Sequence, residues 1–272
     1  MPHTIRRNRL FPKRKANATM AALIDQPTYT LEPHGVDIWL CYENQIDDAS
    51  LLRCYEGLLS EDERQKRSRF YFAEDRHRYL VTRAMVRSVL SLYRPSQEQD
   101  WFFSTNEYGK PFISSESLQF NISHTKGLIV MAVSEDFELG IDVEHEARKN
   151  TGAEIADRFF SPIEIEQLRQ TDPDAFLDFW TLKEAYIKAQ GKGLALPLDS
   201  FSFVLDQQQI RFQSPAIADV DAWRFYLWRV KQFKLALAFK ASIDHESIRY
   251  RLRTIIPQCT IADETLELQA SV

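Results

Sequence analysis

The stretch from Gly140 to Glu146, GIDVEHE, follows an apolar run and then carries a carboxylate at every second position. Successive side chains of a strand point to opposite faces, so Asp142, Glu144 and Glu146 would share one face of one strand. Such a row is ordinary at an exposed strand end, but inside a fold it needs cations or hydrogen-bond donors. The stretch therefore predicts a strand that turns acidic groups toward a site.

The bulk composition fits a globular protein with a core of its own. The chain has 272 residues, of which 44% are hydrophobic and 27% charged, which suits one large domain or two small ones. The net charge of -5 gives no basic field for nucleic acid, and no apolar stretch is long enough to span a bilayer. Cys41, Cys54 and Cys259 show neither metal-site spacing nor a secreted disulfide framework. We therefore expect reduced thiols and a cytoplasmic protein.

The order of predicted elements suggests an internal duplication. In the first part a strand near residues 36–43 precedes a helix that the capping box of Ser60 and Glu63 would start, and a long helix from roughly Arg76 to Tyr93 follows. In the second part GIDVE precedes another long helix in FLDFWTLKEAYIKAQGKG, which Gly191 and Gly193 are expected to end. An Arg-Phe-aromatic triplet stands before a charged helical segment in both SRFYF and DRFFS. This repeat predicts two similar halves with a cleft between them, and such clefts are favoured ligand sites.

The predicted fold class is α+β, with a pseudo-twofold pair of similar halves in one chain. Residues 34–132 would form the N-terminal half, and residues 133–250 the C-terminal half with the acidic strand. Residues 1–33 begin with a crowd of arginines and lysines and no long apolar segment, which indicates a mobile basic arm. Residues 251–272 are expected to form a C-terminal tail.

The second long helix supplies a partner for the acidic strand. It is apolar on most of its circumference, so much of it should be buried. Glu184 lies beside the apolar stripe, with Lys188 one turn further on the same side. Together with Asp142 and Glu144, Glu184 makes a cluster of hard oxygen ligands, which suits Mg²⁺ that is shared with a phosphate-bearing substrate. Glu146 is expected to be a bystander on the same face.

Basic groups that could meet such phosphates occur at three places. Lys110 follows a glycine turn, and Ser123 and His124 lie in NISHTKG, which we interpret as a loop. Arg83 and Arg87 are four residues apart and share a helix face. Each residue taken singly has an ordinary structural explanation. Together they predict a cleft with carboxylates for a metal and with basic groups for phosphates.

The sequence resembles Sfp-type 4'-phosphopantetheinyl transferases in EYGKP, FNISHTKG, GIDVE, RFFSPIE and FWTLKEAYIKAQGKGL, in this order. The resemblance covers roughly residues 60–205, and GxDxE with a downstream WxxKExxxK helix is highly specific. It implies an enzyme that moves the phosphopantetheine arm of coenzyme A to a serine of an apo acyl or peptidyl carrier protein. The other product would be adenosine 3',5'-bisphosphate, and the fold would be the pseudo-twofold pair described above.

The resemblance also implies residue roles. Asp142, Glu144 and Glu184 match the metal triad, for Mg²⁺ with Mn²⁺ as the alternative. Lys188 matches the lysine near the leaving phosphate, and Glu164 matches a position proposed as a base in some members. Whether Glu184, Glu164 or a water takes the serine proton stays open. The residues that match coenzyme A contacts are Lys66, Arg83, Lys110, Ser123, His124 and Lys188.

Some features depart from the family or leave alternatives. Glu63 stands where some members have a basic residue. Acidic carrier proteins would favour a basic docking rim at Arg76, Arg78 and Lys126. One chain supplies both halves, so we expect an active monomer without a nucleic-acid or membrane partner.

Two alternative functions stay open. One is another Mg²⁺-dependent phosphoryl-transfer or pyrophosphate-cleaving enzyme, although the sequence lacks a P-loop. The other is a non-catalytic carrier-binding module.

Overall fold

The structure is a computed structural model of the chain. It describes residues 29–94, 101–114, 117–148, 152–171, 175–206, 209–244, 247–264 and 267–271. Most of the predicted basic arm, residues 1–28, lies outside the described residues. Cys41 is buried, Cys54 and Cys259 are exposed, and all three are free thiols. Among the described residues, no helix is both long enough and apolar enough to cross a membrane.

The first half contains a strand, three helices and then four strands. In chain order they are β1 (Gly35–Cys41), α1 (Ala49–Leu58), α2 (Glu61–Ser68), α3 (Ala73–Tyr93), β2 (Ser104–Thr105), β3 (Pro111–Phe112), β4 (Gln119–Thr125) and β5 (Leu128–Ser134). Two local predictions are confirmed here. Ser60 and Glu63 form the capping box that starts α2, and α3 ends at Tyr93, although it begins three residues before the predicted Arg76.

The second half repeats this order, and three further strands follow it. The elements are β6 (Leu139–His145), α4 (Gly152–Phe159), α5 (Pro162–Gln170), α6 (Ala175–Gln190), β7 (Ser202–Asp206), β8 (Gln209–Gln213), β9 (Trp223–Val230), β10 (Phe233–Lys240), β11 (Arg249–Ile256), β12 (Thr260–Asp263) and β13 (Glu267–Ser271). The helix α6 ends where Gly191 and Gly193 adopt positive φ angles, as the sequence predicts.

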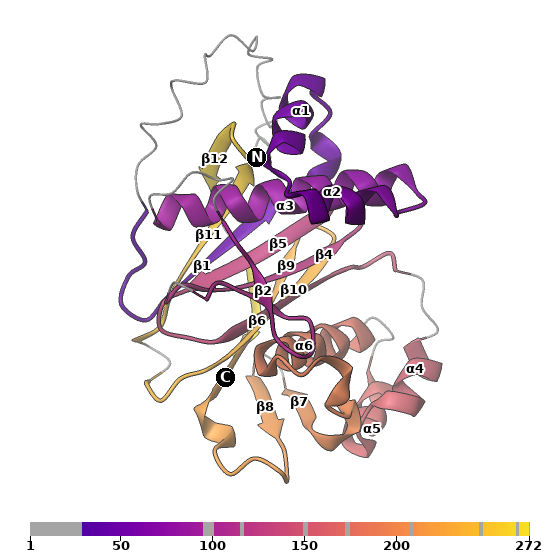
Figure 1. The fold of residues 1–272 in the computed structure, drawn as a ribbon. Helices are drawn as coiled ribbons and strands as arrows, with labels where there is room; N and C mark the ends of the chain where they lie inside the picture. The colour runs from indigo at the N-terminus through magenta and orange to yellow at the C-terminus, as the bar shows by residue number, and fades with distance from the viewer. Residues whose placement is uncertain are drawn as a thin grey trace, which may run out of the picture.

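Two sheets carry the internal symmetry. In the first, β5 lies between β1 and β4, and in the second β10 lies between β6 and β9, with antiparallel pairing throughout. The helices α3 and α6 connect the equivalent strands, and Figure 1 shows α3 and α6 on the outer sides of the two sheets. The predicted α+β fold with two similar halves is therefore confirmed.

The packing of the sheets explains why β1 is buried along its whole length. Val36, Ile38 and Leu40 face the second sheet in a shared apolar core. Trp39 and Cys41, on the other face, pack in the core that includes α3. A strand covered on both faces excludes water from polar residues as well, so any charge on β1 needs a partner inside the fold.

The end of the chain returns to both sheets. The strand β11 pairs in parallel with β1, and β12 pairs with β11. The last strand, β13, pairs with β9 in the second sheet. The described part of the expected C-terminal tail, residues 251–272, thus contributes strands to both sheets.

Candidate functional site

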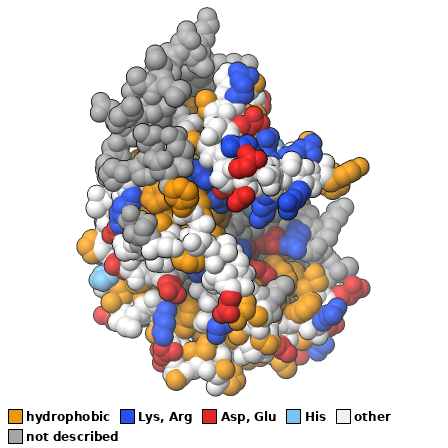
Figure 2. Space-filling model, viewed as in Figure 1, with side chains coloured by type: hydrophobic (Ala, Val, Ile, Leu, Met, Phe, Trp, Pro, Cys, Tyr) orange, Lys and Arg blue, Asp and Glu red, His pale blue; other side chains and the backbone are white. Residues whose placement is uncertain are grey.

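A pocket of about 570 Å³ is lined by side chains of both halves. Figure 2 shows the pocket as a hollow below the projection that α2 and the start of α3 form, with acidic and basic side chains close together. The charged or titratable residues of the lining are Lys66, Asp75, Arg78, Tyr79, Arg83 and His124 from the first half and Asp142, Glu144, Arg148, Glu184 and Lys188 from the second. The pocket thus has a mainly basic wall and a wall with three carboxylates.

The strand β6 brings two of these carboxylates into the pocket. Ile141 and Val143 point into the core between the sheets, so Asp142 and Glu144 point to the opposite face, toward α6. A Cβ atom on Gly140 would lie 2.1 Å from the carbonyl oxygen of Ala185. The backbone of α6 therefore lies directly on β6, and the glycine of GIDVE is what permits this approach.

Asp142 is the most enclosed of the carboxylates. Its Oδ1 accepts hydrogen bonds from Ser123 Oγ at 2.8 Å and from Lys188 Nζ at 2.5 Å. Lys188 also donates to Ser123 Oγ at 2.8 Å. The other oxygen, Oδ2, is buried and has no hydrogen-bond partner among the described residues. Ser123 and His124 lie on the strand β4, so the prediction that NISHTKG is a loop is wrong for its first part.

Glu144 and Glu184 complete the acidic wall. Glu144 forms an ion pair with Arg148 and accepts a hydrogen bond from Trp180 Nε1 at 3.1 Å. Loss of water and the nearby charge of Asp142 raise the pKa of Glu144. The same two causes raise the pKa of Glu184 to about 7, although Lys188 opposes the shift. Three carboxylates thus crowd one wall, and the positive charge nearby is too small to keep Glu144 and Glu184 at their ordinary pKa values.

The acidic wall fits a divalent cation by the chemistry of its donors. The buried, unpartnered Oδ2 of Asp142 and the raised pKa values of Glu144 and Glu184 are what a site for a cation would leave when the cation is absent. However, no group of three or more His, Cys, Asp or Glu side chains in the described part of the chain is arranged to hold a metal ion. Lys188 and Arg148 occupy carboxylate oxygens that a metal would need.

Glu63 lies behind the basic wall and is paired with it through Arg83. Glu63 Oε1 lies 2.5 Å from Arg83 Nη2, and Glu63 Oε2 lies 2.8 Å from Arg87 Nη2. Burial acts to raise the pKa of Glu63, but Arg83, the Ser60 amide and Arg87 outweigh it and lower the pKa. Arg83 lines the pocket, whereas Arg87 lies behind it with 3% of its side chain exposed. The departure at Glu63 thus neutralises part of the basic wall.

Lys66 and His124 stand at the same wall. His124 is exposed toward the pocket, where loss of water and the charges of Arg78 and Lys188 lower its pKa. Arg78 is itself paired with Glu43 and Asp75. The structure thus brings Lys66, Arg83, Ser123 and His124 together with Lys188 in one lining, as the resemblance implies.

Three residues, Arg76, Arg78 and Lys126, were expected to form a basic docking rim, and the structure places them differently. Arg76 donates to the carbonyl oxygens of Phe70 and Tyr71 at 2.8 and 2.9 Å, so it braces the turn between α2 and α3. Arg78 is half-buried in the pocket, and Lys126 is exposed in the turn between β4 and β5.

Two predicted site residues lie outside this lining. Lys110 donates to the carbonyl oxygens of Leu139 and Ala189 at 3.1 and 3.2 Å, so its amino group joins β6 to the end of α6. Glu164 is 0% exposed and pairs with Lys183 at 2.8 Å. A carboxylate without access to the pocket cannot take a proton there, so the structure does not place Glu164 as a base. Glu146, the expected bystander, pairs with Arg229 and also lies outside the lining.

Sequence reasoning missed Arg148 and Trp180 of the lining. Trp180 is four residues before Glu184, and this spacing puts both side chains on one side of α6. The tryptophan of WxxKExxxK could therefore have been assigned to the site. Arg148 lies four residues after Glu144, beyond the end of β6, and its position follows from the turn that the chain takes there.

Comparisons with known proteins agree with this division into halves. A model described as 4'-phosphopantetheinyl transferase, N-terminal, matches residues 49–136, and a model described as the 4'-phosphopantetheinyl transferase superfamily matches residues 138–238. The matches change over between β5 and β6, where the second half begins.

Curated relatives and one solved structure are also similar. The 4'-phosphopantetheinyl transferase Sfp of Bacillus subtilis is 42% identical over 167 residues, which are 59% of this chain and 73% of that protein. The 4'-phosphopantetheinyl transferase HetI of Nostoc sp. is 34% identical over 177 residues, 62% of this chain and 74% of that protein. The Thermotoga maritima holo-[acyl-carrier-protein] synthase aligns with a TM-score of 0.34 and 18% identity over 50% of this chain and 84% of that chain.

Proposed function

Because this chain belongs to the 4'-phosphopantetheinyl transferase family and is of the Sfp type, we propose that its substrates are coenzyme A and an apo carrier protein. The products would be a carrier with 4'-phosphopantetheine on a serine, and adenosine 3',5'-bisphosphate. The observation that carries this proposal is the pocket in which a basic wall faces a wall of three carboxylates with Lys188 between them. Acyl and peptidyl carriers are both suited as acceptors.

The basic wall would bind the phosphates of coenzyme A. Lys66, Arg83 and His124 present nitrogen donors on one side of the pocket, and Ser123 adds a hydroxyl beside Lys188. Hydrogen bonds between cationic donors and phosphate are shorter and stronger than neutral ones. This wall supports binding in the ground state, since its charges are in place before any reaction.

Asp142, Glu144 and Glu184 would hold Mg²⁺, with Mn²⁺ as the alternative. When bound, such an ion neutralises pyrophosphate charge and polarises the phosphorus that is attacked. Two observations support this assignment. Asp142 Oδ2 is buried without a hydrogen-bond partner among the described residues, and three carboxylates lie close together on one wall. Lys188 and Arg148 would then leave the carboxylates and become available to phosphate oxygens.

The transfer needs positioning and charge neutralisation more than covalent help. The serine oxygen of the carrier attacks the phosphorus that bears the pantetheine arm, and a new P–O bond forms. The bond from this phosphorus to the bridging oxygen breaks, and adenosine 3',5'-bisphosphate leaves with that oxygen. Lys188 would stabilise the negative charge that the leaving phosphate gains.

The serine proton would go to Glu184 or to a water held in the pocket. The pKa of about 7 is that of Glu184 without a metal. A bound cation would lower this pKa, so as a metal ligand Glu184 is the weaker proton acceptor of the two. Glu164 is no longer a candidate, because its oxygens are buried and occupied. We propose that one chain, in the cytoplasm, is the active unit, since a single chain supplies both walls of the pocket.

Incubation of the protein with coenzyme A, Mg²⁺ and an apo carrier protein tests this function. We expect the carrier to gain one phosphopantetheine group, measured by its intact mass. Another pyrophosphate-cleaving enzyme would consume coenzyme A and leave the carrier unchanged, and a non-catalytic module would bind the carrier without an adduct. Full activity after EDTA treatment, with no divalent ion added, would contradict the metal part of the proposal.

A further inference from the structure

The motif residue Lys183 lies next to Glu184 in the sequence, but the proposed chemistry does not use it. Its side chain is 0% exposed and pairs with Glu164, which is also 0% exposed, at 2.8 Å. Lys183 Nζ also donates to the carbonyl oxygens of Leu198 and Phe201 at 2.6 and 2.9 Å. An ammonium group has three donors, so all of them are in use.

Glu164 is bound just as completely. Its Oε2 accepts hydrogen bonds from the Ser161 amide at 2.9 Å and from Ser161 Oγ at 2.8 Å. Its Oε1 accepts from the Phe203 amide at 2.9 Å. We call Lys183, Glu164 and Ser161 the α6 lock. It joins the start of α5, the middle of α6 and the start of β7, and none of its side chains lines the pocket.

Apolar packing alone selects the rotation of α6 less sharply than directed polar contacts do. Buried apolar residues occur around most of the helix, among them Phe176, Leu182, Ala185, Tyr186 and Ile187. A helix that is apolar all round can bury similar surface in more than one rotation. A buried polar network that is satisfied in only one arrangement can select that arrangement, as some other proteins show.

Successive residues of an α-helix lie about 100° apart around its axis, because one turn takes 3.6 residues. With Lys183 held on the side of α5 and β7, Glu184 and Lys188 are turned toward β6 and the pocket. Other polar contacts hold the ends of α6, where Asp178 pairs with Lys234 and the Ala189 carbonyl accepts from Lys110. The lock holds the turn that carries Glu184.

We infer that Lys183 and Glu164 are positioning residues, which fix the rotation of α6 so that Glu184 and Lys188 face the pocket. The expected change in kcat rests on the proposed function. The claim that the lock fixes the rotation of α6 is structural and does not depend on that function. A misplacement of about 1 Å in a reacting group can cost on the order of a hundredfold in rate. Loss of the lock should therefore lower kcat while the basic wall, and with it the KM for coenzyme A, is little changed.

The double variant Lys183→Met/Glu164→Met is the decisive one. Either single variant leaves a buried charge without its partner and should be strongly destabilised, whereas apolar replacement of both partners is often neutral. We expect the double variant to be less destabilised than either single variant, because no buried charge is left, although the carbonyls of Leu198 and Phe201 and the amides of Ser161 and Phe203 lose a partner. In this variant kcat should fall at least about tenfold. The matched control is Leu182→Ala, which loosens the packing of the same helix without touching the lock and should keep kcat.

Two results would overturn the inference. One is a stable double variant with wild-type kcat, which would make the pair purely structural. The other is a Leu182→Ala variant that loses as much kcat as the double variant. If the double variant does not fold, Ser161→Ala removes one donor and keeps both charges. We expect it to lower kcat a few-fold, and an unchanged kcat in Ser161→Ala would also overturn the inference.

A crystal structure of the double variant gives a measurement that does not depend on activity. We expect Glu184 and Lys188 to leave their places in the pocket lining, and finding both in place would contradict the lock. If the wild-type protein itself forms no phosphopantetheine adduct, the proposed function fails, while this structure still decides whether the lock positions α6.

Discussion

The two halves begin with the same short pattern but use its aspartate in opposite ways. The strand β1 starts Gly35-Val36-Asp37, and β6 carries Gly140-Ile141-Asp142 at the same place. Asp37 is 1% exposed and Asp142 is 4% exposed, so each needs partners. Asp37 is fully neutralised within the fold, whereas Asp142 lies on the wall of the pocket.

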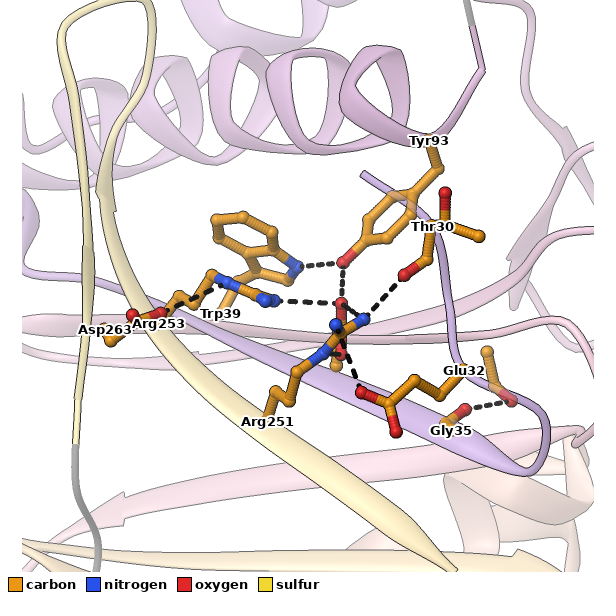
Figure 3. Close-up of polar contacts among 10 residues, drawn as sticks. Thr30, Glu32, Gly35, Trp39, Tyr93, Arg251, Arg253 and Asp263 are labelled. Carbon is orange, nitrogen blue, oxygen red and sulfur yellow. Dashed lines mark hydrogen bonds and ion pairs between the residues drawn. The ribbon is translucent and has the colours of Figure 1, made fainter. Parts of the chain in front are cut away.

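Three side chains that Figure 3 shows turned toward one another, Tyr93, Arg251 and Arg253, all donate hydrogen bonds to Asp37. Tyr93 of α3 donates to Asp37 Oδ2 at 2.5 Å, and Arg253 of β11 donates to the same oxygen at 2.9 Å. Arg251 of β11 donates to Oδ1 at 2.8 Å and to Oδ2 at 3.1 Å. Trp39 completes the network through a hydrogen bond to the hydroxyl of Tyr93.

The charge of Asp142 is neutralised less completely than that of Asp37. The helix partner of Asp142 is Lys188 of α6, and the neighbouring strand β4 supplies a serine, Ser123, where β11 supplies two arginines to Asp37. One oxygen of Asp142 is left without a hydrogen bond among the described residues. The comparison teaches that a duplicated aspartate becomes structural where the surrounding charge is balanced, and available for chemistry where it is not.

Replacement of Asp142 should give the largest effect on activity. Asp142→Ala removes one of three proposed metal ligands, and a metal contributes several kcal/mol to the transition state. We expect transfer to the carrier to fall by about 1,000-fold or more, with little loss of stability because carboxylate crowding is relieved. Mass analysis of the carrier and urea denaturation measure the two quantities. Near-normal transfer would remove Asp142 from the site.

Replacement of Asp37 should show the reverse pattern. Asp37→Ala leaves Arg253, with 7% of its side chain exposed, without its buried carboxylate. Breaking a buried pair from one side costs about 3–5 kcal/mol, and we expect the lower end because Arg251 is 33% exposed and can reach water. Urea denaturation measures the loss. The kcat of the folded variant should stay near normal, and a large loss of kcat without destabilisation would break the comparison.

The helix partners of the two aspartates provide a matched pair of milder variants. Lys188→Ala should lower kcat by on the order of a hundredfold, the scale of one lost charge-stabilising donor. Tyr93→Phe should leave kcat unchanged and lower stability by about 1–2 kcal/mol, because the Trp39 indole and Asp37 lose a partner. Steady-state kinetics, with circular dichroism as a check on folding, separates the two. A folded Lys188→Ala enzyme with near-native kcat would remove Lys188 from the mechanism.

Local patterns in the sequence predicted local structure well, and tertiary contacts explain what they missed. The capping box at Ser60 and the alternation in GIDVE each need only a few neighbouring residues, so both could be read directly. The partners of Asp37 on β11 are 214 and 216 residues away, and no spacing rule connects them. Lys110 and Glu164 were assigned by resemblance to the pocket, but the packing of α6 turns both side chains to structural partners.

Glu184 of the acidic wall and Glu63 behind the basic wall should respond to pH in opposite directions when no metal is bound. The folded pKa of Glu184, about 7, is above its ordinary value of 4.5, so the folded protein binds this proton more tightly. Its contribution to stability is therefore present below pH 4.5 and is lost as pH rises through 7. For Glu63 the folded pKa is lowered, so its contribution is lost as pH falls below 4.5.

Urea denaturation of EDTA-treated protein at pH 5 and at pH 8 measures the effect of Glu184. We expect the wild-type protein to lose about 2 kcal/mol more stability between these values than Glu184→Gln does, at 1.36 kcal/mol per pKa unit. Asp142, Glu144, Lys188 and Arg148 act on Glu184 as well, so the variant should reduce the slope without removing it. An equal slope in both proteins would show that the acidic wall is not crowded.

The smallest expected effect tests whether the basic wall acts in binding alone. His124 lies on β4 of the first half and faces the pocket. A hydrogen bond to a charged group contributes about 1.5 kcal/mol, so His124→Ala should raise the KM for coenzyme A roughly tenfold. The kcat should change little, because the contact is made in the ground state and in the transition state alike. Gln119→Ala, at the far end of the same strand, is the control and should change neither constant. A fall in kcat with an unchanged KM would show that His124 acts in the transfer step. It would then be wrong that the basic wall acts in binding alone.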